Sequence, residues 1–341
     1  MFPDFYGNRA VAEALWQALQ TGRIPQTILL AGPRGVGKAT LARRFAAYLL
    51  GDPQKIEQDD LSLPHNVTYL RERESWPAER RNEEPFLLAT HPDFVTFAPD
   101  GPLRQISIHQ MRLLKELAQY RPLRGNYRVF LIDQLDRANE QAANSLLKTL
   151  EEPPAHLILI ATAENPYELL PTIRSRSVIF HLGPLSPEEM AQFVRARGLN
   201  ELERRAALAQ GSPGLAVSLD LEVYDRRRQA MLTLIEVAAA LKPFASWIEQ
   251  SEGAVRQEKL EDLLSVLYGL LRDLMLLQQG GETYALRNRD IQEKLENLAA
   301  RLDFGWLRRA VAQADEIAGL IRRNIQKNLA LDAWVWTLRA A

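Results

Sequence analysis

The stretch TILLAGPRGVGKAT, residues 27–40, constrains the fold of this chain more than any other part of the sequence. Apolar residues 28–31 precede a glycine-rich turn and a lysine, and an apolar-periodic segment follows. This order predicts a buried strand, a loop and a helix. Gly32, Gly35 and Gly37 would let backbone N–H groups converge on a phosphate at the helix N-terminus, where Lys38 adds a positive charge. The stretch therefore predicts a phosphate-binding loop.

The same stretch lacks the residue that should bind a metal. The pattern GxxxxGK is complete at Gly37 and Lys38, but Ala39 occupies the next position, where a Ser or Thr hydroxyl would bind Mg²⁺. Thr40 follows one place late. We therefore expect a weak or vestigial site for ATP or ADP, with no bound metal.

A second predicted strand supplies the carboxylate that such a loop requires. In VFLIDQ, residues 129–134, Asp133 follows the apolar run. ATPases of this layout usually have Glu next, but here the residue is Gln134, which can orient a water and cannot accept its proton. Because Ala39 and Gln134 weaken two functions of one reaction, we expect no ATP hydrolysis. The predicted nucleotide-binding residues are Gly32, Gly35, Gly37, Lys38, Thr40 and Asp133.

Strands and helices alternate over the first half of the chain. Apolar runs predict strands at 28–31, 94–97, 128–132, 157–162 and 178–181. Helical spacing predicts helices at 9–21, 39–50, 106–120 and 138–150. This alternation predicts an α/β fold with a parallel sheet covered by helices on both faces. The polar and charged segment 52–90 interrupts it, and we interpret that segment as a solvated insertion, with a partner-binding loop as the alternative.

Strands end at residue 181, and the rest of the chain is typical of helix. Ser186 begins a capping box, and three short helices are expected before long amphipathic segments at about 257–279 and 304–339. We therefore predict three domains: an α/β nucleotide-binding-type domain at 1–181, a helical lid at 182–222 and a helical domain at 223–341.

Composition excludes several other kinds of site. The 341 residues carry a net charge of −1, so no overall field would draw the chain to nucleic acid. The absence of cysteine excludes disulfides, thiolate zinc sites and cysteine nucleophiles. We find neither a signal peptide nor an apolar run that could span a membrane, so a cytoplasmic protein is expected.

Several longer segments resemble a known family. NSLLKTLEEPP (144–154), LIATAENP (159–166) and TIRSRS (172–177) resemble the clamp-loader branch of the AAA+ ATPases. HPDFVTFAP (91–99) and IQKNLALDAWVWTL (325–338) resemble, more narrowly, subunits of the bacterial DNA polymerase III clamp loader. The resemblance implies an AAA+ fold, a helical lid and an all-α collar that joins the subunits in a ring.

The resemblance also implies an arginine that acts on a neighbouring subunit. The family's Ser-Arg-Cys motif stands here as Ser175-Arg176-Ser177, with the arginine retained. A guanidinium supplied in trans stabilises charge on a transferring phosphoryl group. A surface salt bridge is the simpler alternative for Arg176, and Arg174 has the same chemistry two residues away.

Other positions depart from the family pattern. Residues 52–90 replace a four-cysteine zinc module, so no zinc is expected. Gly214 occupies the place of the lid arginine that senses the γ-phosphate. Thr162 stands at the first sensor position, where a plain strand-end residue is an equal alternative.

Together these features imply a non-hydrolysing stator subunit of the DNA polymerase III holoenzyme. The implied partners are motor subunits of the gamma/tau type and a clamp-opening delta-type subunit, with the sliding clamp and primed DNA contacted mainly through the complex. No membrane partner is expected. An active AAA+ motor of the gamma/tau type and a pure assembly scaffold are the alternatives.

Overall fold

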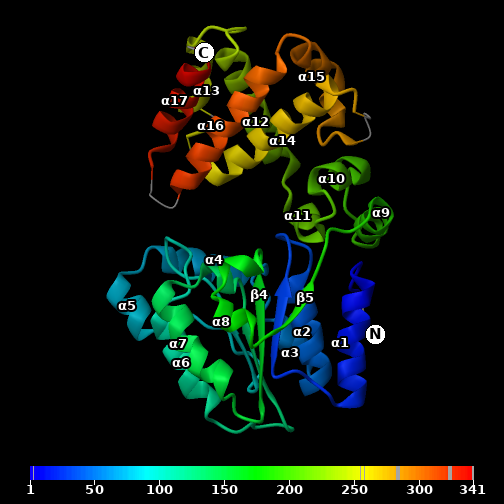
Figure 1. Cartoon of the computed structure of the whole chain (residues 1–341), viewed down its shortest axis with the longest axis vertical. Helices are drawn as coiled ribbons and strands as arrows, with labels where there is room; N and C mark the ends of the chain where they lie inside the picture. The colour runs from blue at the N-terminus through cyan, green and yellow to red at the C-terminus, as the bar shows by residue number, and fades with distance from the viewer. Residues whose placement is uncertain (3, 254, 257, 282–284, 322–324, 340–341) are drawn as a thin grey trace. The chain divides into compact units, whose positions relative to one another are not determined.

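The computed structural model describes residues 1–2, 4–253, 255–256, 258–281, 285–321 and 325–339. Two compact units form, and each is described by itself: Met1–Phe193 with Gly211–Gly214, and Val194–Gln210 with Leu215–Ala341. The described strands all belong to the first unit (Figure 1). This division does not test the lid at 182–222, which stays a prediction.

A five-stranded parallel sheet forms the centre of the first unit, in the order β2-β3-β4-β1-β5. The strands are β1 (Thr27–Ala31), β2 (Phe94–Phe97), β3 (Arg128–Ile132), β4 (Leu157–Ala163) and β5 (Val178–His181). Every residue of the first four strands is buried, which fits a parallel sheet covered on both faces. The predicted α/β class and the positions of all five strands are confirmed.

Helices pack on both faces of the sheet. Alternate residues of β1 point to opposite faces: Leu30 packs with α1 (Arg9–Thr21) and α2 (Lys38–Leu50), and Leu29 packs with α6 (Ile108–Ala118) and α7 (Glu140–Glu151). The remaining described elements of this unit include the α-helices α3 (Pro53–Glu57), α4 (Pro64–Glu74), α5 (Ala78–Glu83), α8 (Pro171–Arg174) and α9 (Pro187–Ala196, which ends in the second unit) and the 3₁₀ turns Leu135–Arg137 and Pro166–Glu168.

The interpretation of residues 52–90 as solvated is wrong at the centre of that segment. The Arg73 side chain of α4 is only 1% exposed and donates from Nη2 and Nε to the two carboxylate oxygens of Asp100, at 2.6 and 3.0 Å. Its guanidinium carbon lies 4.5–5.6 Å from the ring centroids of Tyr69, Trp76 and Phe86. An arginine at a buried helical position hides the apolar periodicity that would have revealed α4.

The second unit is helical in its described part. Its elements are α10 (Leu202–Ala209), α11 (Pro213–Ser218, which begins in the first unit), α12 (Leu221–Ala238), α13 (Ala245–Glu252), α14 (Leu260–Gln278), the 3₁₀ turn Arg289–Ile291, α15 (Gln292–Ala299), α16 (Phe304–Leu320) and α17 (Lys327–Arg339). Helix α14 packs with α12, α15 and α16 (Figure 1), and its buried leucines belong to the same hydrophobic core as residues of α17. The amphipathic segment predicted at 304–339 is described as two helices, and residues 322–324 lie outside the described residues.

No α-helix in the described ranges is both long enough and apolar enough to cross a membrane.

Candidate functional site

The loop from β1 to α2 adopts conformations that favour glycine. The φ angles of Gly32, Gly35 and Gly37 are +145°, +76° and +99°. A Cβ on Gly32 would lie 2.0 Å from the backbone oxygen of Leu182, so that position also requires glycine for space. The helix begins at Lys38, directly after the loop, so its dipole favours an anion there. These residues fit a phosphate.

Lys38 is held against the loop. Its side chain is 8% exposed, and its Nζ donates to the backbone oxygens of Gly32 and Pro33, the latter at 2.8 Å. An ammonium has three donors, so one remains for a phosphate oxygen. Burial lowers the pKa of Lys38, while the nearby carboxylate of Glu164 acts in the opposite direction. Bound phosphate would favour the charged form in the same way as that carboxylate.

Asp133 is fixed by the neighbouring strand. Thr162, fully buried at the end of β4, donates from Oγ1 to Asp133 Oδ1 at 2.5 Å. The same hydroxyl accepts the backbone N–H of Gln134 at 2.8 Å. The hydroxyl of Thr162 therefore orients the carboxylate, which a plain strand-end residue would not do; a sensor role for Thr162 stays a prediction.

The donor set fits a metal poorly. Ala39 offers no hydroxyl, and Thr40 lies one position further into α2. Among the residues that the structure describes, no three His, Cys, Asp or Glu side chains form a group that could hold a metal ion. Asp133 is brought to the edge of the sheet where the loop lies, but the hydroxyl that should face it from the first turn of α2 is missing.

A second segment of the first unit is bonded to the loop. The Gly214 N–H donates to the Gly35 backbone oxygen at 2.9 Å, and Ser212 Oγ donates to the Arg34 backbone oxygen at 3.1 Å. A Cβ on Gly214 would lie 3.0 Å from Cα and O of Gly35. No sequence signal marks this contact, because its partners are more than 170 positions apart. The residue in place of the lid arginine thus touches the loop through its backbone.

Arg176 follows α8 on the surface of the first unit. Its Nη2 lies 3.0 Å from Glu151 Oε1, its Nη1 donates to the Thr172 backbone oxygen at 3.1 Å, and the side chain is 35% exposed. The salt bridge considered as the simpler alternative is therefore present. The guanidinium nevertheless remains partly open to solvent, so a role toward a neighbouring subunit stays a prediction.

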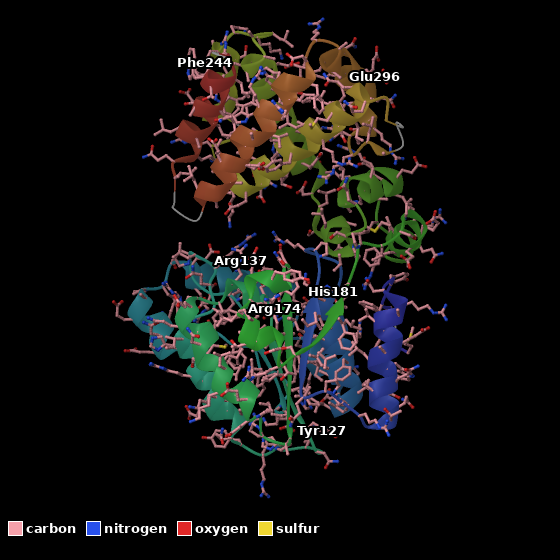
Figure 2. The ribbon with its side chains drawn as sticks, viewed as in Figure 1. Tyr127, Arg137, Arg174, His181, Phe244 and Glu296 are labelled. Atoms are coloured by element: carbon pink, nitrogen blue, oxygen red, sulfur yellow. The ribbon has the colours of Figure 1, made fainter. Side chains whose placement is uncertain are left out.

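Arg174 has different surroundings from Arg176. Its guanidinium carbon lies 5.1 Å from the ring centroid of Tyr167. In Figure 2, Arg174, Arg137 and His181 lie toward the end of the sheet where the strands have their carboxyl ends, and Tyr127 lies toward the opposite end. Of the two arginines in TIRSRS, only Arg176 is paired with a carboxylate in the described residues.

Two family models match the chain. One, described as DNA polymerase III, delta subunit, matches residues 79–186. The other, described as DNA polymerase III, delta subunit, C terminal, matches residues 224–339. Together they match parts of both compact units.

Curated relatives of the chain are also DNA polymerase III subunits. The chain is 30% identical to the DNA polymerase III subunit tau of Escherichia coli (strain K12) over 304 residues, which are 81% of this chain and 44% of that protein. It is 26% identical to the DNA polymerase III subunit gamma of Buchnera aphidicola subsp. Acyrthosiphon pisum (strain APS) over 292 residues, 84% of this chain and 71% of that protein. The chain spans less than half the length of the tau proteins that it matches.

A solved structure shares the fold. The crystal structure of a DNA polymerase III, gamma subunit-related protein from Thermotoga maritima aligns with a TM-score of 0.50 at 15% identity, covering 96% of this chain and 98% of that chain. At this identity the likeness concerns the fold alone.

Proposed function

The chain belongs to the family of DNA polymerase III clamp-loader subunits, and from that premise we propose that it is the non-hydrolysing stator of such a complex, a subunit of the delta-prime type. The proposal rests on the contrast between two sites of the first unit. Its own nucleotide loop lacks the metal-binding hydroxyl and the base, whereas Arg176 stays on the surface with its guanidinium partly exposed.

The proposed role of Arg176 is electrostatic. Charge accumulates on a γ-phosphate as it transfers, and a guanidinium placed beside it stabilises that charge. An arginine that arrives from the adjacent subunit makes hydrolysis depend on the assembled ring. In this proposal the neighbour is a motor subunit of the gamma/tau type, and hydrolysis in the ring drives loading of the sliding clamp onto primed DNA during replication.

The two alternative functions are an active motor and a pure scaffold, and residues of the first unit argue against both. An active motor is disfavoured by Ala39, Gln134 and Gly214, which remove three groups that respond to ATP. A pure scaffold is disfavoured by the loop, because Lys38 and the three glycines at positive φ keep a phosphate-binding shape that a scaffold would not need.

The stator role is tested by Arg176→Ala in the reconstituted complex. The variant should fold and assemble, because an exposed ion pair contributes little stability. A trans arginine accelerates transfer by about 10³- to 10⁵-fold at its own site, so ATP hydrolysis at one site of the ring should be lost and the total rate should fall in part. The measurement is steady-state phosphate release with clamp and primed DNA present.

Arg174→Ala is the matched control, because Arg174 lies two residues away and contacts Tyr167. It should have the smaller effect. An Arg176→Ala complex that assembles and hydrolyses ATP at the unmodified rate would remove the stator proposal and favour the scaffold.

We also propose weak binding of ATP or ADP at the loop. Lys38→Ala should weaken binding of a fluorescent ADP analogue by about 10-fold or more, since a hydrogen bond to a charged group contributes roughly 1.5–3 kcal/mol. Omitting Mg²⁺ should change the affinity little, because Ala39 cannot bind the metal. Lys55→Ala, at an exposed lysine paired with Asp52, is the control. Equal titrations for wild type and Lys38→Ala would show that the loop is vestigial.

A further inference from the structure

We propose that Glu151 is a positioning residue for Arg176, and this inference rests on the proposed stator function. Glu151 is the last residue of α7, and Arg176 follows α8, the short helix that packs beside α7. The pair joins two elements 25 positions apart in the chain at 3.0 Å. No sequence pattern within TIRSRS points to this carboxylate, which comes from the separate LEEPP segment.

The bonding of Arg176 sets the direction of its guanidinium without using all its donors. Nη2 donates to Glu151, while Nη1 donates to the Thr172 backbone oxygen. A guanidinium has five N–H donors, and no partner for Nε is found among the residues that the structure describes. The remaining donors can meet a phosphate oxygen while Glu151 and Thr172 still hold the other side of the group.

Such positioning matters because of the length of the side chain. A free arginine samples many rotamers, and ordering it at the moment of reaction would cost entropy. A planar guanidinium held at both Nη atoms has lost most of that freedom before the neighbouring phosphate arrives. Since Glu151 is 50% exposed, its ion pair contributes little to folding. We therefore assign it an effect on the reaction rate of the complex.

The test compares Glu151→Ala, Glu151→Gln and Glu152→Ala in the reconstituted complex, with kcat and KM for ATP measured separately. Glu151→Ala should lower kcat at the site that Arg176 serves by about 3- to 10-fold, so that the total rate falls by less than it does for Arg176→Ala, and KM should be unchanged, because ground-state binding of ATP does not involve a positioning contact. Glu151→Gln should recover most of the rate, since its amide oxygen accepts the same hydrogen bond. Glu152→Ala removes the same charge from the adjacent, exposed position and should have no effect.

Adding Glu151→Ala to Arg176→Ala should cause no further loss, because nothing remains to be positioned. A wild-type kcat for Glu151→Ala, a faster rate, or an equal loss in the Arg176→Ala background would overturn the positioning role while leaving the stator function standing. An Arg176→Ala complex with unchanged hydrolysis would overturn both. Thermal unfolding of each variant checks that the subunit remains folded.

Discussion

Purified alone, the chain should release phosphate from ATP at least about 10⁴-fold more slowly than a working ATPase. Loss of the metal ligand at Ala39 and of the base at Gln134 should each remove on the order of 10²-fold in rate. The measurement is phosphate release by the isolated chain with and without primed DNA. Turnover near one per second, which is typical of enzymes, would contradict the prediction.

Lys38→Ala serves as the control for this assay. Any slow turnover that belongs to the chain should fall when Lys38 is removed, since its ammonium is the charge that the loop presents to phosphate. A trace rate that is equal in the two preparations comes from a contaminating ATPase and does not count against the prediction.

The largest effect on stability is expected from Arg73→Leu. The substitution would leave the Asp100 carboxylate, which is 8% exposed, without its charged partner. Breaking a buried ion pair by removing one member costs about 3–5 kcal/mol. The free energy of unfolding of the first unit, measured from urea denaturation by circular dichroism, should fall by that amount.

Arg80→Leu is the matched control. Arg80 also lies over the Trp76 ring, at 3.6 Å from its centroid, but its side chain is 52% exposed and its ion pair with Glu84 is long, at 3.7 Å. Its loss should change the free energy of unfolding by about 1 kcal/mol or less. Adding Asp100→Leu to Arg73→Leu should restore part of the stability, because no buried charge is then left unpaired. Equal effects of Arg73→Leu and Arg80→Leu would show that the buried pair is not important.

The sheet unit could be predicted from local pattern because its strands are continuous apolar runs. All residues of β1 and β3 are buried, and runs of that kind are hard to place anywhere except in a covered parallel sheet. Helix starts can also be predicted from neighbouring residues, because a capping box joins two residues three positions apart. Ser107 and Gln110 form the capping box that begins α6, and Ser186 forms one with Glu189.

The unpredicted features depend on pairs that are distant in the sequence. Asp133 and Thr162 meet because β3 and β4 are neighbours in the sheet, an order that apolar runs alone do not give. From the sequence alone, Arg73 would be predicted to face solvent, because its ion-pair partner Asp100 comes from a distant part of the chain. The residues of the phosphate loop could be named from sequence, whereas the bond from Gly214 to Gly35 could not.

That bond between Gly214 and Gly35 has a consequence for any attempt to turn the chain into a motor. Recovering a motor from this sequence would require Thr or Ser at 39, Glu at 134 and Arg at 214, and the last change would place a Cβ 3.0 Å from the Gly35 backbone. We expect no hydrolysis from any one of these changes alone, and the third would require the Gly35 backbone to move by a few tenths of an ångström. An arginine at 214 and the present conformation of the phosphate loop therefore compete for the same space, so the three changes would have to be made together with an adjustment of the loop.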